Sequence, residues 1–238
     1  MHRFFVSPGH ISPEAVAFTP RQSRQIARVL RLRTGDTVEA LDNLGTMYRV
    51  RLDEVSLDAV RGAIVDRGPA PGEPHIRVHL WQGLLKGGSW EWVLQKGTEV
   101  GVSAFHPVMC IRSVAKDTSE GRVRRWGTIL QEAAEQSGRG LVPELAPIAS
   151  WEEACRAASG SGLLLYEGER QTRLREALLG FGDDVLHLLV GPEGGLAGAE
   201  VSAAQEQGIP PVTLGPRVLR AETAGVIAAA LVLYEKGS

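Results

Sequence analysis

The sequence predicts an α/β protein in which a small β-barrel precedes a larger domain built on a mostly parallel sheet. Over residues 1–68, short alternating stretches surround a single helical segment, a texture typical of a small barrel. After residue 74, continuous apolar runs alternate with helical patterns, which is typical of parallel strands buried on both faces. A chain of 238 residues is long enough to bury both cores.

The N-terminal domain is expected over residues 1–70. Its strands are expected at 3–6, 37–41, 48–55 and 60–66, with Asn43-Leu44-Gly45 as a hairpin turn. Thr19-Pro20 is expected to open the helix, because proline suits the first helical turn. The apolar residues Ile26, Val29 and Leu30 recur at helical spacing. We therefore expect the neighbouring arginines to lie mainly on the other sides.

A linker is expected at Arg67–Pro74, where three prolines and two glycines fall within eight residues, and it places the second domain at 74–238. Strands are expected there at 76–81, 105–111, 163–166, 185–190 and 211–214. Helices are expected at 88–100, 119–138, 151–158, 170–179, 198–207 and 221–235. The helix at 119–138 carries the clearest apolar stripe, which consists of Val123, Trp126, Leu130, Ala133 and Ser137.

Charge and cysteine content exclude several classes of protein. The net charge is −2, but residues 20–33 contain five arginines and no acid. Such a segment fits phosphate binding and a solvated helix face equally well. Cys110 and Cys155 lie far apart and outside any CxxC pair, so no disulfide framework or zinc site is indicated. The chain lacks a signal-peptide pattern and any apolar run near the roughly 18 residues that span a bilayer. We expect a cytoplasmic protein without metal or membrane contact.

Three segments that could carry chemistry each follow an apolar strand, at 163–169, 188–195 and 212–224. In an open α/β sheet, ligands bind beyond the carboxyl ends of the strands. Gly191-Pro192 and Gly215-Pro216 both turn the chain abruptly, and glycine lets the backbone approach a ligand closely. Either bend alone is more often an ordinary turn, but the two together favour a ligand site. The sequence contains neither a P-loop nor the usual dinucleotide fingerprint.

VGPEGGL at 190–196 and LGPRVLRAETA at 214–224 resemble the signature loops of the SPOUT superfamily of knotted methyltransferases. More narrowly, the chain resembles the bacterial 16S ribosomal RNA uracil-N3 methyltransferase family, whose further motifs occur in order along it. These are MHRFFV at 1–6, RVLRLRTGD at 28–36, LLKGGSWEWVLQKGTEVGV at 84–102, IRSV at 111–114 and EAAEQSGRGLVPEL at 132–145. Two positions depart from the pattern. Gln25 stands where the family commonly has histidine, and Leu196-Ala197-Gly198 lacks the usual hydroxyl cap.

The resemblance implies S-adenosylmethionine-dependent methylation of uracil N3 at one uridine of 16S ribosomal RNA in the small subunit. It also implies a PUA-like N-terminal barrel that binds RNA, a C-terminal SPOUT domain with a trefoil knot, and a homodimer whose interface includes the knot. Pattern reasoning alone would have rejected a knot, because true knots are rare. The residues that the resemblance sets against the cofactor are Tyr166, Gly191, Gly194, Gly195, Leu214, Gly215 and Leu219.

Methyl transfer to uracil N3 requires that the N3 proton be removed or that the resulting anion be stabilised, so a cation is expected near the base. We assign this role to Arg220, oriented by Glu222; the alternative is a salt bridge that caps the last helix. Arg139 is a third catalytic candidate, from a polar set with Glu132 and Gln136 whose alternative is a solvated face. The candidates for RNA phosphate contact are Arg3, Arg24, Arg28, Arg31 and Arg112.

Three other functions fit parts of the sequence. The chain could be a non-catalytic RNA-binding or ribosome-assembly protein, although the intact glycines of both bends argue against this. It could be a SPOUT methyltransferase acting on transfer RNA or on a ribose hydroxyl, against which only the ordered motifs speak. A metabolic α/β enzyme with a small substrate leaves the arginine-rich helix unexplained.

Overall fold

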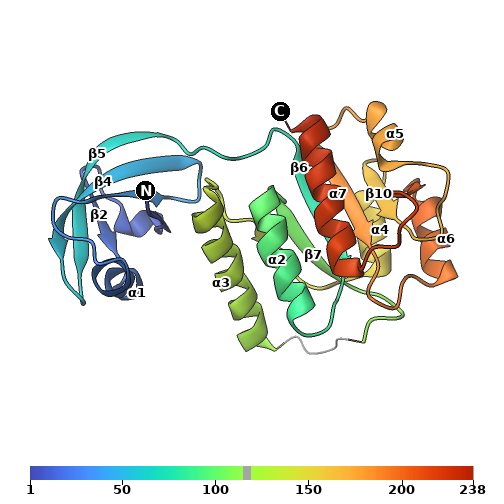
Figure 1. Cartoon of the computed structure of the whole chain (residues 1–238), viewed down its shortest axis with the longest axis horizontal. Coiled ribbons are helices and arrows are strands. Elements are labelled where there is room, and N and C mark those ends of the chain that lie inside the picture. Colours follow the sequence, from blue (N-terminus) through green and yellow to red (C-terminus); the bar gives the residue numbers. More distant parts are fainter. Residues whose placement is uncertain (115–118, 238) are drawn as a thin grey trace. The chain divides into compact units, whose positions relative to one another are not determined.

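A computed structural model describes residues 1–114 and 119–237 of the chain (Figure 1). The chain divides into two compact units. The N-terminal unit comprises residues 1–73 and 134–142, and the C-terminal unit comprises residues 74–133 and 143–238. The return of 134–142 to the N-terminal unit was not predicted, because this short segment carries no boundary pattern of its own.

A five-stranded mixed sheet forms the N-terminal unit. Its strands are β1 (Arg3–Phe5), β2 (Ala15–Phe18), β3 (Thr37–Leu41), β4 (Thr46–Val55) and β5 (Val60–Pro69). They pair in the order β1-β3-β4-β5-β2, with β1 parallel to β3 and the other pairs antiparallel. The predicted hairpin joins β3 to β4, where Asn43 and Gly45 both adopt positive φ, at 58° and 101°. Strand β2 was missed, because its four residues are too short to show a period.

The arginine-rich segment begins as the helix α1 (Pro20–Arg24) and continues as a π-helical turn, η2 (Gln25–Val29). Thr19 caps α1 through a capping box with Gln22, which confirms the predicted start. Ile26 is fully buried in the core of the sheet, as predicted. Val29 is 71% exposed, so the prediction that it faces the core is wrong, because the π turn rotates it out of the helical register.

The first half of the predicted linker at Arg67–Pro74 is paired with the sheet. Its first residues extend β5 to Pro69, which pairs with Thr46 of β4. Ala70 then donates its backbone N–H to the carbonyl of Gly45 at 2.8 Å. The sheet therefore continues through residues 67–70, and residues 71–74 connect the two units outside any helix or strand.

A seven-stranded parallel sheet forms the centre of the C-terminal unit. Its strands are β6 (Arg77–Gly83), β7 (Ala104–Met109), β8 (Glu144–Leu145), β9 (Ala149–Ser150), β10 (Gly162–Leu165), β11 (Val185–Val190) and β12 (Pro211–Val212). Six of them follow the order β12-β10-β11-β6-β7-β8, and β9 also pairs with β7. Every pair is parallel, as the continuous apolar runs predicted. The strands β8 and β9 were not predicted, because two residues are too few to form a pattern.

Helices cover both faces of this sheet (Figure 1). The helices α2 (Gly88–Val100) and α7 (Ala221–Lys236) pack against each other, and α7 lies on β6 and β11. The helices α4 (Trp151–Ala158) and α6 (Gly198–Glu206) pack together on the other face, where a second core lies. The short helix α5 (Leu174–Leu179) contacts α7. None of the helices in the two described ranges has the length and apolar character needed to cross a bilayer.

The helix α3 (Glu120–Ser137) follows the predicted stripe only over its middle turns. Trp126, Leu130 and Ala133 are buried, and Trp126 contacts Trp90 of α2 with ring centroids 5.6 Å apart. Val123 and Ser137 are exposed, so the ends of the predicted stripe are wrong. The 3.6-residue period therefore identified the buried face but not how far along the helix the burial extends.

Candidate functional site

A cavity of about 570 Å³ opens in the C-terminal unit at the carboxyl ends of β10, β11 and β12. Its wall is formed mainly by residues from 165–170, 190–195 and 212–224, with Ser89 added from α2. The three segments predicted from the sequence thus converge on one cavity, because the carboxyl ends of adjacent parallel strands meet at one edge of the sheet. The volume falls in the range of small-molecule sites, roughly 300–1,000 Å³.

Six of the seven predicted cofactor residues line this cavity; they are Tyr166, Gly191, Gly195, Leu214, Gly215 and Leu219. Gly194, the seventh, does not appear in its wall. Instead, the Gly194 carbonyl accepts a hydrogen bond from Nη1 of Arg112 at 3.1 Å. The cavity therefore combines apolar side chains with bare backbone, which suits a flat aromatic ring held by backbone hydrogen bonds.

The bend after β11 requires glycine at residue 195. Gly195 has φ +67°, and its N–H donates to the Pro192 carbonyl at 2.9 Å, which closes a tight turn. A Cβ at this position would lie 2.6 Å from Oε1 of Glu167, another cavity residue. Glu193, which also lines the cavity, anchors the bend, because its carboxylate accepts the backbone N–H of Lys86 at 2.8 Å. The bend is thus tied to the segment that precedes α2.

The bend after β12 is organised by Thr213. Its hydroxyl accepts the N–H of Gly215 at 3.2 Å and donates to the Gly215 carbonyl at 3.1 Å. Gly215 has φ +121°, which other residues rarely adopt, while the space around it is open. The glycine is therefore required here by backbone conformation and not by crowding.

The segment after β10 is shaped by Glu169, a residue that the sequence analysis did not single out. Its Oε1 accepts backbone N–H groups of Thr172, Gln171 and Arg170, at 3.0, 2.6 and 2.9 Å. These backbone hydrogen bonds, with that from Thr172 foremost, lower the pKa of Glu169 below its usual range. In the sequence, the only sign of this turn is an acidic residue directly before the three residues whose N–H groups it accepts.

Arg220 and Glu222 both line the cavity, at the start of α7. Arg220 is the N-cap residue of this helix, and its Nη1 lies 3.9 Å from Oε1 of Glu222. The Arg220 side chain is 86% exposed and that of Glu222 is 17% exposed. The structure therefore brings this predicted pair together at the cavity, with the guanidinium on the solvent side.

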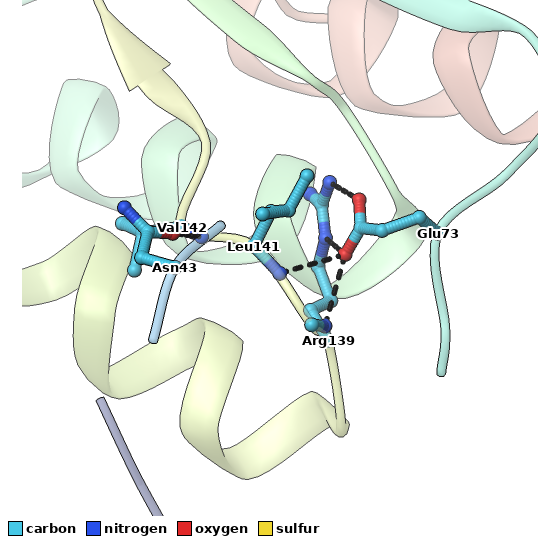
Figure 2. Close-up of polar contacts among 6 residues, drawn as sticks. Asn43, Glu73, Arg139, Leu141 and Val142 are labelled. Atoms are coloured by element: carbon cyan, nitrogen blue, oxygen red, sulfur yellow. Dashed lines mark hydrogen bonds and ion pairs between the residues drawn. The ribbon is translucent and has the colours of Figure 1, made fainter. Parts of the chain in front are cut away.

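Arg139, the third predicted catalytic residue, is not brought to the cavity. It belongs to the N-terminal unit, is only 3% exposed, and pairs with the carboxylate of Glu73 (Figure 2). The solvated face considered as an alternative is wrong for this residue, because its side chain is buried. Sequence spacing placed Arg139 on the extension of α3, but the helix ends at Ser137 and Gly138 follows with φ +83°. That turn redirects the side chain.

The five predicted RNA-contacting arginines occupy different environments. Arg24, Arg28 and Arg31 are exposed on the N-terminal unit, and Arg31 has a positive φ of 55°, which is unusual for a residue with a Cβ. Arg3 is not on this surface, because its Nε pairs with Glu39 at 2.6 Å and its Nη1 donates to the carbonyl of Gly138. The structure thus gives Arg3 internal partners where a phosphate contact was predicted.

A histidine cluster on the C-terminal sheet was missed, because its members lie far apart in the sequence. His79 Nδ1 and His106 Nε2 are 3.2 Å apart, and Nδ1 of His187 accepts the indole N–H of Trp81 at 2.8 Å. The indole of Trp81 stacks on His106 with ring centroids 3.9 Å apart. Burial lowers the pKa of both His106 and His187 to about 4, so the rings are neutral at pH 7.

The chain matches known proteins over nearly its full length. Residues 72–233 match a family model described as an RNA methyltransferase domain. The chain is 32% identical to ribosomal RNA small subunit methyltransferase E of Bacillus subtilis over 249 residues, covering 99% of this chain and 97% of that protein.

Two solved structures are similar over their whole length. One is a ribosomal RNA small subunit methyltransferase E from Neisseria gonorrhoeae bound to S-adenosylmethionine, with TM-score 0.85, 29% identity, and 99% and 98% of the two chains covered. The other is Lpg2936 from Legionella pneumophila, in complex with the same cofactor, with TM-score 0.88, 27% identity and the same coverage.

Proposed function

The chain belongs to the RNA methyltransferase family, among the ribosomal RNA small subunit methyltransferases E, and on this premise we propose that it methylates N3 of one uridine in 16S ribosomal RNA with S-adenosylmethionine as the methyl donor. One structural observation carries the proposal. The bends after Val190 and Leu214 border a single cavity together with Arg220 and Glu222. A donor site and a cationic group are therefore adjacent, as methylation of a ring nitrogen requires.

The cavity fits the proposed donor. Leu165, Val190, Leu214 and Leu219 offer apolar area for an adenine ring, and the glycines leave backbone groups accessible. When bound, S-adenosylmethionine supplies an electrophilic methyl group. The six predicted residues that line the cavity are proposed to hold it, while Gly194 is proposed to act only by shaping the bend. Similar chains solved with this cofactor support the assignment.

For the reaction itself, we assign charge stabilisation to Arg220. Transfer of the N3 proton to water leaves negative charge on the uracil oxygens, and a guanidinium within reach stabilises it. Glu222 lies 3.9 Å from Arg220 and restricts where the exposed guanidinium points. Holding the ring nitrogen in line with the methyl group supplies much of the remaining rate gain. Arg139 lines no part of the cavity, so its predicted role is not carried into this mechanism.

The N-terminal unit is proposed to be a PUA-like RNA-binding domain. Its exposed Arg24, Arg28 and Arg31 provide charge for phosphate contacts, and the exposed Arg112 adds a cation beside the bend at Gly194. The target base must leave its stack to reach a cavity of this kind. Ribosomal RNA as the substrate also implies a cytoplasmic location.

The C-terminal unit is proposed to contain the trefoil knot and to form a homodimer. The knot is proposed from the resemblance of the loops at 190–196 and 214–224 to the SPOUT signature loops. The homodimer is supported by exposed apolar side chains along α7, at Ile227, Leu231 and Tyr234.

Two measurements test the proposed function. Isothermal titration calorimetry of the full chain should detect S-adenosylmethionine binding. Incubation with the donor and with 16S RNA or small subunits, followed by nuclease digestion and mass spectrometry, should yield 3-methyluridine. A methyl group on a ribose, or on transfer RNA in preference to 16S RNA, would refute the assigned target. Absence of binding would instead favour a non-catalytic RNA-binding protein.

A further inference from the structure

Gln82 is a buried polar residue directly behind the first bend of the cavity. It lies near the carboxyl end of β6, paired in register with Val190 of β11, the residue immediately before Gly191. The side chain is fully buried. Its Nε2 donates a hydrogen bond to the carbonyl oxygen of Gly191 at 3.0 Å. A side chain of β6 thus holds the backbone of the loop that follows the adjacent strand, β11.

The peptide between Gly191 and Pro192 has a particular need for this contact. Proline has no backbone N–H, so the carbonyl of Gly191 is the only polar group through which this peptide can be anchored. The adjoining Gly83 lets the bend approach, because a Cβ at residue 83 would lie 2.6 Å from the nitrogen of Pro192. Gln82 and Gly83 together form the surface on which the bend rests.

The other end of the Gln82 amide faces α7. Within the described residues its Oε1 is buried and has no hydrogen-bond partner. A Cβ at Gly225 would lie 2.8 Å from this oxygen, so the absence of a side chain at Gly225 makes room for it. An unpaired buried carbonyl destabilises the fold, so this amide is not explained by stability alone. An amide side chain carries both an NH₂ donor and a carbonyl oxygen. The hydrogen bond from Nε2 to Gly191 therefore brings Oε1 into the buried space beside α7.

Gln82 therefore lies between two segments that border the cavity. It bonds to Gly191, which lines the cavity, and it lies beside Gly225 of α7, whose neighbour Ala224 also lines it. We infer that Gln82 is a positioning residue for the methyl-donor site: with Gly225, it sets the separation between the Gly191 bend and the start of α7. This inference rests on the proposed function for the identity of the ligand, but the spacing itself is a property of the unliganded chain.

The experiment compares two variants of the full chain with two matched controls. Gln82→Met keeps the length of the side chain and removes the donor, and Gly225→Ala keeps the donor and displaces Oε1. The control Thr98→Val removes a buried hydroxyl that donates to the Leu94 carbonyl in α2. The control Gly127→Ala adds a methyl group at a helical glycine with no neighbour within 4 Å.

Hydrogen–deuterium exchange without ligand is the first readout. For both variants we expect exchange to become about fivefold to tenfold faster in 190–197 and 221–226, with little change elsewhere. The reason is that Gln82→Met removes the hydrogen bond to Gly191, and Gly225→Ala displaces the amide that makes it. The second readout is the Kd for S-adenosylmethionine, which should rise about tenfold while the controls stay within about twofold. A purely structural role would instead lower the melting temperature and speed exchange throughout the unit, as in Thr98→Val.

Unchanged exchange in 190–197 in either folded variant would overturn the inference, and so would a Kd that stays at the wild-type value. If Gln82→Met does not fold, Gly225→Ala decides the question, because it leaves the donor in place. A wild-type chain that binds no S-adenosylmethionine would refute the proposed function instead. The exchange measurement would then still determine whether Gln82 positions the bend.

Discussion

The guanidinium of Arg139 and the carboxylate of Glu73 form an ion pair, with Nη2 and Oε2 2.5 Å apart, that fastens residues 138–142 to the end of the first segment of the N-terminal unit. Oε1 of this carboxylate also accepts the backbone N–H groups of Gly140 and Leu141, at 3.0 and 3.1 Å. Nearby, the side-chain oxygen of Asn43 accepts the N–H of Val142 at 2.7 Å. The Glu73 carboxylate therefore organises residues 139–141, and Asn43 holds the residue that follows (Figure 2).

Arg139→Met should destabilise the chain by roughly 2–4 kcal/mol, because it leaves the Glu73 carboxylate, whose side chain is only 25% exposed, without its cation. Urea unfolding monitored by circular dichroism measures this loss. The control is Arg49→Met, since Arg49 and Asp66 form an exposed pair at 3.9 Å that should contribute less than about 1 kcal/mol. Equal effects of the two substitutions would contradict the structural role of Arg139.

Acid should destabilise the C-terminal unit through the histidine cluster. His106 and His187 have folded-state pKa values of about 4, below the 6.5 of the unfolded chain, so the unfolded state binds more protons between these values. No penalty exists above pH 6.5, and stability falls as the pH drops from 6.5 towards 4. Protonation of His187 at Nδ1 also removes the acceptor for Trp81.

His106→Phe, which can keep the stacking on Trp81, should make this pH dependence shallower, by on the order of 2–3 kcal/mol between pH 7 and pH 4.5. Urea unfolding at several pH values measures the slope. His10→Phe in the N-terminal unit serves as the control, because His10 is exposed. A slope that His106→Phe leaves unchanged would show that the cluster does not titrate as described.

Arg220→Ala should reduce the methylation rate about 100-fold, because it removes a donor that stabilises charge in the transition state. The Kd values for S-adenosylmethionine and RNA should change far less, and single-turnover kinetics separates these effects. Arg156→Ala is the matched control, since it removes an exposed arginine from α4, outside the cavity wall. Full turnover by Arg220→Ala with normal RNA binding would eliminate Arg220 from the mechanism.

The arginine surface of the N-terminal unit predicts a salt-dependent RNA affinity. The double variant Arg24→Ala/Arg28→Ala should weaken RNA binding and reduce the slope of log K against log salt by about 1.5–2, as the loss of two phosphate contacts predicts. Filter binding at several salt concentrations measures both quantities. The double variant Arg156→Ala/Arg175→Ala changes the net charge equally on other elements and should leave the slope near the wild-type value. Equal slopes for the two double variants would place the RNA elsewhere.

Gly195→Ala should raise the Kd for S-adenosylmethionine about tenfold, because alanine is strained at φ +67° and the added Cβ displaces the exposed carboxylate of Glu167, another cavity residue. Calorimetry measures this change. Gly198→Ala, three residues further on, adds a methyl group where nothing lies within 4 Å and should leave the Kd within about twofold. A wild-type Kd in folded Gly195→Ala would show that this bend does not form the donor site.

Most of the elements could be predicted because their patterns are local. The apolar run at 185–190 is β11 at the predicted bounds, and α4 spans the predicted 151–158. The converging segments at 188–195 and 212–224 could also be predicted, since parallel strands bring their carboxyl ends to one edge. The start of α6 lacks a hydroxyl cap, as predicted, but Glu200 accepts the N–H of Ala197 at 2.8 Å, which is the carboxylate half of a capping box. That contact lies within one helical turn, yet only the side-chain conformation reveals it.

The amino-acid sequence by itself determined the two-part organisation, the strand and helix periods, the glycine bends and the arginine-rich segment, because each depends on residues within a few turns of one another. Only the tertiary structure decided which arginines are free to meet a phosphate, that Arg139 closes an ion pair with Glu73, and that three distant histidines share one face of a sheet. It also decided that Gln82 stands behind the Gly191 bend. The physical reason is that a side chain's partners depend on packing between elements that are far apart in the sequence. The distances between those elements are set by strand order and helix placement, which local periodicity does not encode.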